Sequence, residues 1–84
     1  MANDEKEIGE VTHYFDHIGV AVIKFSVSCK DGDEVHFMGH GADFTQKVES
    51  MQKDHEDVAE VKKGDEVGMK VSKKVKEGTK LFAA

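Results

Sequence analysis

The chain has 84 residues, of which 38% are apolar and 35% are charged, and its formal net charge is −5. This length predicts one small domain, and the patterned apolar runs are typical of a globular protein rather than a disordered one. All twelve basic residues are lysines, so the sequence lacks the guanidinium groups that favour bidentate phosphate contacts, and its negative charge disfavours non-specific binding of nucleic acid.

Cys29 is the only cysteine, so no intramolecular disulfide can form, and a lone thiol fits a reducing compartment. No apolar run approaches the roughly 20 residues that a transmembrane helix needs. Residues 1–7 are polar and acidic, without the basic and apolar regions of a signal peptide. We therefore expect a cytoplasmic monomer with no membrane contact, a disordered N-terminus over residues 1–7 and a single domain over residues 8–82.

The first predicted strand covers residues 8–15. Ile8 and Val11 stand at opposite parity, and a bulge near Gly9 would turn both side chains toward the interior. Residues 16–19 place Asp first and Gly fourth, as a type I turn prefers, so we expect this turn to join two antiparallel strands.

Residues 20–25 form the most apolar run of the chain and are rich in β-branched side chains. They predict a central strand that is buried over most of both faces. Residues 34–39 predict a further strand, with Val35 and Phe37 pointing inward because apolar and polar residues alternate there.

Local rules disagree over residues 44–63. Four apolar residues and one histidine are spaced four, three, four and three residues apart, as on the buried face of an amphipathic helix. They are Phe44, Val48, Met51, His55 and Val58. Asp43 could serve as the N-cap of such a helix. The same residues also allow a strand with a bulge near Ser50, because tertiary context can override local propensity.

One turn pattern occurs three times, each time directly before a predicted strand. A lysine is followed by any residue, a glycine, two polar residues and an apolar residue, beginning at Lys30, Lys62 and Lys76. The glycine can adopt the positive φ that ends a tight turn. Three such strand entries, the last before a short strand over residues 79–82, predict an all-β meander or barrel.

These strands together predict which apolar side chains meet in the interior. The predicted core is Ile8, Val11, Val20, Val22, Ile23, Val35, Phe37, Val48, Met51, Val67, Met69, Val71 and Leu81. Cys29 is interpreted as a small apolar filler rather than as a reactive thiol.

No motif of catalysis or phosphate binding is present. The sequence has no phosphate-binding loop, and the Gly39–Gly41 segment offers only two glycines with no helix start behind them. No serine or cysteine stands in a motif that marks a positioned base. We therefore expect neither enzymatic activity nor a nucleotide or other cofactor.

The five histidines give only a weak pattern for metal binding. His13 and His17 are four residues apart, as are His36 and His40, but that spacing converges on a helix and not across strands and turns. A site formed by His13, His36 and a carboxylate is conceivable. The alternative, which we favour, is that the histidines face solvent and bind no metal.

Residues 32–39 read Gly-Asp-Glu-Val-His-Phe-Met-Gly. They resemble the Gly-acid-x-Val-x-Ile/Phe-x-Gly signature of the second domain of translational GTPases such as elongation factor Tu. Further segments are similar to parts of that domain in the same order, namely residues 8–22, 48–51, 63–68 and 77–81. The resemblance covers about residues 8–82 and implies a free-standing homologue of that domain. It also suggests copies fused to collagenase-like peptidases.

The resemblance implies an all-β fold, a closed antiparallel β-barrel of about six strands, with residues 44–53 extended. It implies no GTP hydrolysis, because the GTP-binding domain of the family is missing. It suggests a non-catalytic module that binds RNA or tRNA, or a translation-associated protein. Glu49 matches the glutamate of the family's middle strand that approaches the terminal nucleotide of tRNA. Gln52 stands at a nearby position that is Arg in elongation factor Tu, and Glu66 stands at a turn position that is often Asn, so both depart from the family pattern while remaining candidate binding residues. The alternative is a protein-interaction or adaptor module without RNA contact, in which Glu49 and Gln52 lie on a plain solvated strand face.

Overall fold

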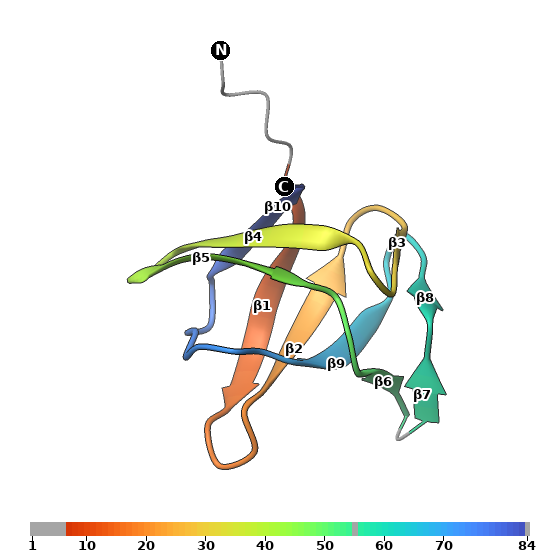
Figure 1. Cartoon of the computed structure of the whole chain (residues 1–84), viewed down its shortest axis with the longest axis horizontal. Coiled ribbons are helices and arrows are strands. Elements are labelled where there is room, and N and C mark those ends of the chain that lie inside the picture. The colour runs from red at the N-terminus through yellow and green to blue at the C-terminus, as the bar shows by residue number, and fades with distance from the viewer. Residues whose placement is uncertain (1–6, 55, 84) are drawn as a thin grey trace.

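The computed structural model describes residues 7–54 and 56–83, and within them every regular element is a β-strand. The strands are β1 (Glu7–Phe15), β2 (Val20–Phe25), β3 (Cys29–Lys30), β4 (Glu34–Gly39), β5 (Ala42–Lys47), β6 (Met51–Lys53), β7 (Glu56–Val58), β8 (Glu60–Val61), β9 (Glu66–Lys70) and β10 (Lys80–Ala83) (Figure 1). The all-β prediction is confirmed. Residues 1–6 of the predicted disordered N-terminus lie outside the described part of the chain, and Glu7 opens β1.

All strand pairs are antiparallel. Eight strands form one sheet in the order β5-β4-β10-β1-β2-β9-β6-β7, and β3 pairs with β8 in a second, two-stranded sheet. The large sheet bends so that the β4–β5 hairpin crosses the direction of β1 and β2 (Figure 1). The prediction of a closed six-stranded barrel is wrong, because no backbone pairing within the described residues joins the two ends of this eight-stranded sheet.

A side chain bridges the gap that the backbone leaves open. Gln46 of β5 donates from Nε2 to the carbonyl oxygen of Lys70 at 3.0 Å, and its Oε1 accepts from the backbone N–H of Ser72 at 2.8 Å. One amide group therefore holds β5 against the segment that follows β9. This contact replaces part of the strand ladder that a closed barrel would have.

The three glycine turns form as predicted and share one hydrogen-bond pattern. Gly32, Gly64 and Gly78 have φ of 97°, 91° and 93°, and each stands two residues before a strand, β4, β9 or β10. In each turn the fourth residue donates from its backbone N–H to the carbonyl of the lysine at 3.0 Å. The side chain of that fourth residue, an Asp, Asp or Thr, accepts in return from the lysine N–H at 3.0, 2.9 and 3.2 Å.

The predicted bulge near Gly9 is confirmed. The register of β1 against β10 shifts between Glu7 and Gly9, and both Ile8 and Val11 are buried. A Cβ on Gly9 would lie 3.1 Å from the carbonyl oxygen of Lys24 and 3.1 Å from Cγ2 of Ile23. Glycine is required here by close packing of β1 on β2 rather than by an unusual backbone angle.

Residues 44–53 are extended, so the strand interpretation is confirmed and the helical spacing is misleading. The segment is divided between β5 and β6, and Ser50 between them has φ of 57°. Because this kink breaks the alternation, Phe44, Val48 and Met51 can all face the interior. Asp43 lies within β5 and caps no helix, and His55 lies outside the described residues.

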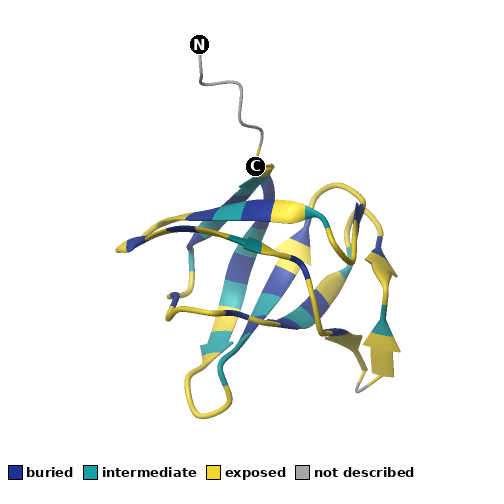
Figure 2. Ribbon diagram, in the orientation of Figure 1, coloured by how far each residue is buried: buried dark blue, intermediate teal, exposed yellow. Residues whose placement is uncertain are grey.

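The core lies inside the bent sheet, and buried and exposed residues alternate along its strands (Figure 2). The prediction that β2 is buried on both faces is wrong. Ala21, Ile23 and Phe25 are fully buried, whereas Val20 and Val22 are only half-buried on the outer face. The prediction missed several buried side chains: Phe25, Ala42, Phe44, Val61 and Val75. No helix long and apolar enough to cross a membrane occurs in the part of the chain that the structure describes.

Candidate binding site on the outer face

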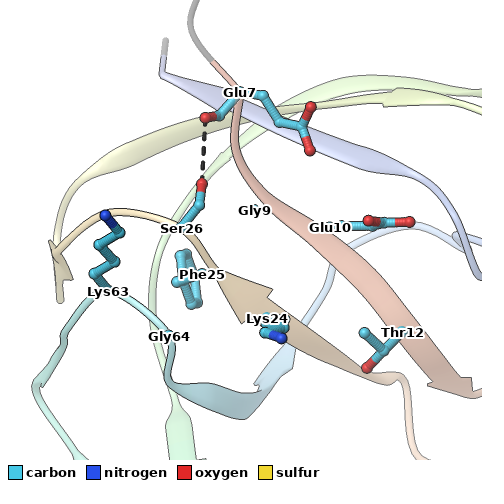
Figure 3. A pocket seen from close by; sticks show the side chains of 9 residues that line it. All are labelled: Glu7, Gly9, Glu10, Thr12, Lys24, Phe25, Ser26, Lys63 and Gly64. Carbon is cyan, nitrogen blue, oxygen red and sulfur yellow. Dashed lines mark hydrogen bonds between the residues drawn. The ribbon is translucent and has the colours of Figure 1, made fainter.

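A pocket of about 300 Å³ opens on the outer face where β1 and β2 meet the turn before β9. Its charged lining residues are Glu7, Glu10, Lys24 and Lys63 (Figure 3). Glu10 and Lys24 are there because they alternate with buried neighbours along β1 and β2. The third wall is the turn, whose Gly64 donates from its N–H to the carbonyl of Phe25 at 2.8 Å.

Charges of opposite sign alternate across the four strands beside this pocket. Strand register places Lys80 opposite Glu10, Glu10 opposite Lys24, and Lys24 opposite Glu66. We call these four residues the charge row. Opposite charges on directly paired residues stabilise a sheet, and together they can hold complementary charged groups of a ligand.

Hydrogen bonds fix both ends of the charge row. Lys80 Nζ lies 3.3 Å from Glu7 Oε2 and 3.4 Å from Glu10 Oε1. These bonds, first to Glu7 and then to Glu10, raise the pKa of the Lys80 ammonium above its usual value. At the other end, the Thr12 hydroxyl donates to Glu66 Oε2 at 2.7 Å.

The structure separates the three site residues that the sequence predicts. Glu66 belongs to the charge row. Gln52 lies on β6 opposite Gly68 and donates from Nε2 to Asp57 Oδ1 at 3.0 Å, so it shares the outer face but not the pocket. Glu49 is exposed between β5 and β6, in a different depression lined by Gln46 and Lys70.

Sequence reasoning missed the other members of the charge row, Glu10, Lys24 and Lys80. The alternation of charged and buried residues along each strand marks them as outward-facing. Their mutual contact depends on a strand pairing between Glu10 and Lys80, and no local pattern contains that pairing.

The histidines do not form the conceivable metal site. His13 Nδ1 lies 3.0 Å from Glu77 Oε2, and His36 Nε2 lies 2.7 Å from Asp43 Oδ1, so each has a different carboxylate partner. Their strands, β1 and β4, are separated by β10. Among residues 7–54 and 56–83 no group of three potential ligands is placed to hold a metal ion.

We predict that stoichiometric zinc leaves the melting temperature of the protein unchanged. A metal that binds the folded state stabilises it by mass action, and two-ligand His–carboxylate pairs are too sparse for a closed zinc site. A thermal melt with and without zinc checks this prediction. A rise of several degrees would contradict it.

The turn before β9 stabilises the ionised carboxylate of Asp65. Its carboxylate accepts from the Lys62 backbone N–H at 2.9 Å and from Lys53 Nζ at 3.1 Å. The backbone hydrogen bond, followed by the bond from Lys53, lowers the pKa of Asp65 below its ordinary value of 3.8. The ionised form is therefore the one that the folded turn prefers.

From this shift we predict an acid-dependent loss of stability. Because the folded-state pKa lies below the unfolded one, Asp65 stabilises the fold above the unfolded pKa, and this contribution is lost as the pH falls through the folded pKa. Asp65→Asn keeps an acceptor for the Lys62 N–H but lacks the charge. Its melting temperature should fall less than that of the parent on acidification below about pH 4. Identical pH profiles would contradict the assignment.

Cys29 is buried in β3, opposite Val61 of β8. Burial, and then the neighbouring Asp33 carboxylate, raise the pKa of the Cys29 thiol to about 11. The thiol therefore stays protonated near neutral pH, and the interpretation as an apolar filler fits this position.

Comparison with known proteins gives two kinds of match, and no family model matches the sequence. An uncharacterized protease of Methanocaldococcus jannaschii is 35% identical over 77 residues, which are 90% of this chain. The chain spans only 19% of the length of that protease.

Two crystal structures share the fold. Both are of the C-terminal domain of a putative U32 peptidase from Geobacillus thermoleovorans. The selenomethionine variant superposes with a TM-score of 0.86 at 24% identity, covering 92% of this chain and 98% of that domain. The other superposes with a TM-score of 0.87 at 22% identity, covering 94% and 92%.

These matches correct the interpretation drawn from the sequence motifs. The inferred kinship with the second domain of translational GTPases is wrong, because the sequence match leads to a protease and the fold matches lead to a peptidase domain. The inferred function as a translation-factor-like module that binds RNA or tRNA is wrong for the same reason. The fold is that of a domain found at the C-terminus of a putative peptidase.

Proposed function

We propose that the chain is a non-catalytic accessory domain of the kind that ends U32 peptidases, and that it acts by docking on a peptidase domain. The observation that carries this proposal is the extent of the fold match. The superposition covers 98% of an isolated C-terminal domain and 92% of this chain. The match to only 19% of a protease also suits a module that accompanies a larger catalytic part.

The outer face of the sheet suits binding better than catalysis. Lys80 and Glu10 of the charge row form an ion pair and Glu66 accepts a hydrogen bond, and the row includes no nucleophile beside a positioned base. The single thiol, Cys29, is buried and protonated, so it is a poor nucleophile. We propose that catalysis belongs to the partner domain, and that the protein works in the cytoplasm.

A competition experiment tests the proposal. The Methanocaldococcus protease is prepared without its matching 77-residue segment, and the excised segment is titrated into it by calorimetry. The 84-residue chain is then added as a competitor. We expect both to bind one site with a dissociation constant of about 10 μM or tighter, as suits a protein–protein interface of standard size.

An unrelated small β-domain of similar net charge serves as the negative control. If the excised segment binds and the chain does not displace it, the proposal is wrong for this chain. If the excised segment itself does not bind, docking on the peptidase domain is wrong altogether.

A further inference from the structure

Basic residues are concentrated in one segment of this acidic protein. Between Lys70 and Lys80 the chain has five lysines and one carboxylate, Glu77, although its net charge is −5. In Figure 1 the connection between β9 and β10 lies on the side of the molecule opposite to β6, β7 and β8, which carry several carboxylates.

The basic segment is held in a fixed shape although the described chain has no strand or helix between β9 and β10. Val71, Val75 and Thr79 are buried at intervals of four residues, and the lysines between them face solvent. Val71 donates from its N–H to the Gly19 carbonyl at 3.0 Å, and Gly78 donates to the Val11 carbonyl at 2.8 Å. The lysines are thus presented on an anchored backbone, which lowers the entropy cost of binding through them.

Four lysines of the segment have no carboxylate partner. Lys70, Lys73, Lys74 and Lys76 are exposed, and within residues 7–54 and 56–83 none of them forms an ion pair with a carboxylate. Glu77 is occupied by His13 at 3.0 Å, and Glu49 lines a depression together with Lys70. Lys73, Lys74 and Lys76 therefore present positive charge that no ion pair among the described residues compensates.

Two exposed apolar side chains lie on the hairpin that contacts the start of this segment. Phe15 and Ile18, at the tip of the β1–β2 hairpin, are 49% and 64% exposed. The hairpin and the basic segment are joined by the bond between Val71 and Gly19 and by the pairing of Lys70 with Val20. We call Phe15, Ile18, Lys70, Lys73, Lys74 and Lys76 the hairpin–loop face.

We propose that the hairpin–loop face docks into an apolar cleft rimmed by carboxylates on a protein partner. An apolar centre with a charged rim is the usual anatomy of a protein–protein interface, and complementary charge sets its orientation and association rate. An exposed isoleucine adds nothing to phosphate recognition, and lysine without arginine lacks the bidentate fork that nucleic acids favour. The inference rests on the proposed function in taking the partner to be a protein.

The probe for this inference is a peptide in which a Leu-Phe-Leu centre is flanked by runs of glutamate. We expect the folded chain to bind it with a dissociation constant of about 100 μM or tighter at low salt, and to lose affinity as salt screens the charges. The combined Lys70→Glu, Lys73→Glu, Lys74→Glu and Lys76→Glu variant should bind at least about tenfold more weakly. The corresponding Lys→Gln variant should show a smaller loss.

Matched controls exist elsewhere on the surface. Reversing Lys30 and Lys62, two exposed lysines in the turns before β4 and β9, should leave most of the affinity intact, whereas the matched reversal of Lys73 and Lys74 should not. Phe15→Ser with Ile18→Ser should weaken binding, whereas Val27→Ser with Met38→Ser, at two apolar residues that are each 38% exposed, should not. Circular dichroism confirms that each variant is folded.

Three results would overturn the inference. They are no binding of the peptide by the parent chain, an equal loss in the control lysine variant, and equally tight binding of a single-stranded RNA that also depends on the four lysines. The last result would mean a general polyanion site. If the peptide binds this face and the truncated protease does not bind the chain, the docking surface stands and the proposed peptidase partner falls.

Discussion

Phe37→Ala is expected to destabilise the protein by about 3–5 kcal/mol, because it removes a large side chain from the closed core and leaves a cavity. Phe37 is fully buried on β4 and stacks on Phe44 with ring centroids 4.8 Å apart and an interplanar angle of 6°. For a domain of this size the melting temperature should fall by at least about 12 °C. Urea unfolding followed by circular dichroism measures the loss.

The next residue on the same strand provides the control. Met38 points to the outer face and is 38% exposed, so Met38→Ala should change the stability by no more than about 0.5 kcal/mol. Equal losses at Phe37 and Met38 would mean that β4 is in a different register from the one described.

Cys29 should resist alkylation in the folded protein. With the pKa of its thiol raised to about 11 by burial and then by Asp33, the thiolate is rare at about pH 8, and the Cys29 residue is only 4% exposed. We expect iodoacetamide to react at least about a hundredfold more slowly than with the unfolded chain, whose cysteine has a pKa near 8.5. Mass spectrometry over a time course measures both rates.

A variant at Asp33 separates the two causes of this protection. Asp33→Asn removes the neighbouring charge but keeps an acceptor for the Lys30 N–H, which Asp33 Oδ2 accepts at 3.0 Å. Alkylation of this variant should be faster than in the parent and still slower than in the unfolded chain. A parent protein that reacts as fast as its unfolded form would show that Cys29 is accessible.

The turns could be predicted from the sequence because their information is local. Each glycine turn needs one residue with positive φ and one side chain that reaches back three residues, and both are readable in six consecutive letters. Gly64 and Asp65 illustrate this, since φ of Gly64 is 91° and Asp65 accepts from the Lys62 N–H. The three strand entries followed from this chemistry, whereas the extended state of residues 44–53 was implied only by the resemblance.

The same local pattern led to the wrong assignment to the second domain of translational GTPases. The Gly-acid-x-Val pattern of residues 32–35 meets the requirements of a tight turn entering a strand, and any antiparallel domain can meet them in the same way. The pattern therefore predicts a fold class and carries little information about ancestry. The solved structures that share the fold of this chain belong to the C-terminal domain of a putative peptidase.

The faces of β2 could not be predicted because both are apolar in sequence. Val20, Ala21, Val22 and Ile23 are all apolar. The alternation of side chains along a strand therefore does not show which face of β2 points into the core. Pairing with β1 and β9 decides the matter, and it places Ala21 and Ile23 inside.

The candidate site was only partly predictable for a related reason. Glu66 could be singled out from its own turn, but its neighbours in the charge row come from three other strands. Lys80 meets Glu10 only because the C-terminal strand β10 pairs with the N-terminal strand β1. Contacts between distant parts of the chain depend on register, and register follows from the packing of the whole core.

The contact of Gln46 with Lys70 and Ser72 has a consequence for local opening of the fold. The backbone hydrogen bonds between paired strands break cooperatively. The hydrogen bonds of the Gln46 side-chain amide can break while the strands stay paired. β5 is an end strand of the sheet, and when the Gln46 contact breaks, the outer edge of β5 loses this cover, so that its N–H and C=O groups can template the addition of another chain. Gln46 thus adds to the resistance against strand exchange that the buried Ala42 and Phe44 give the same strand.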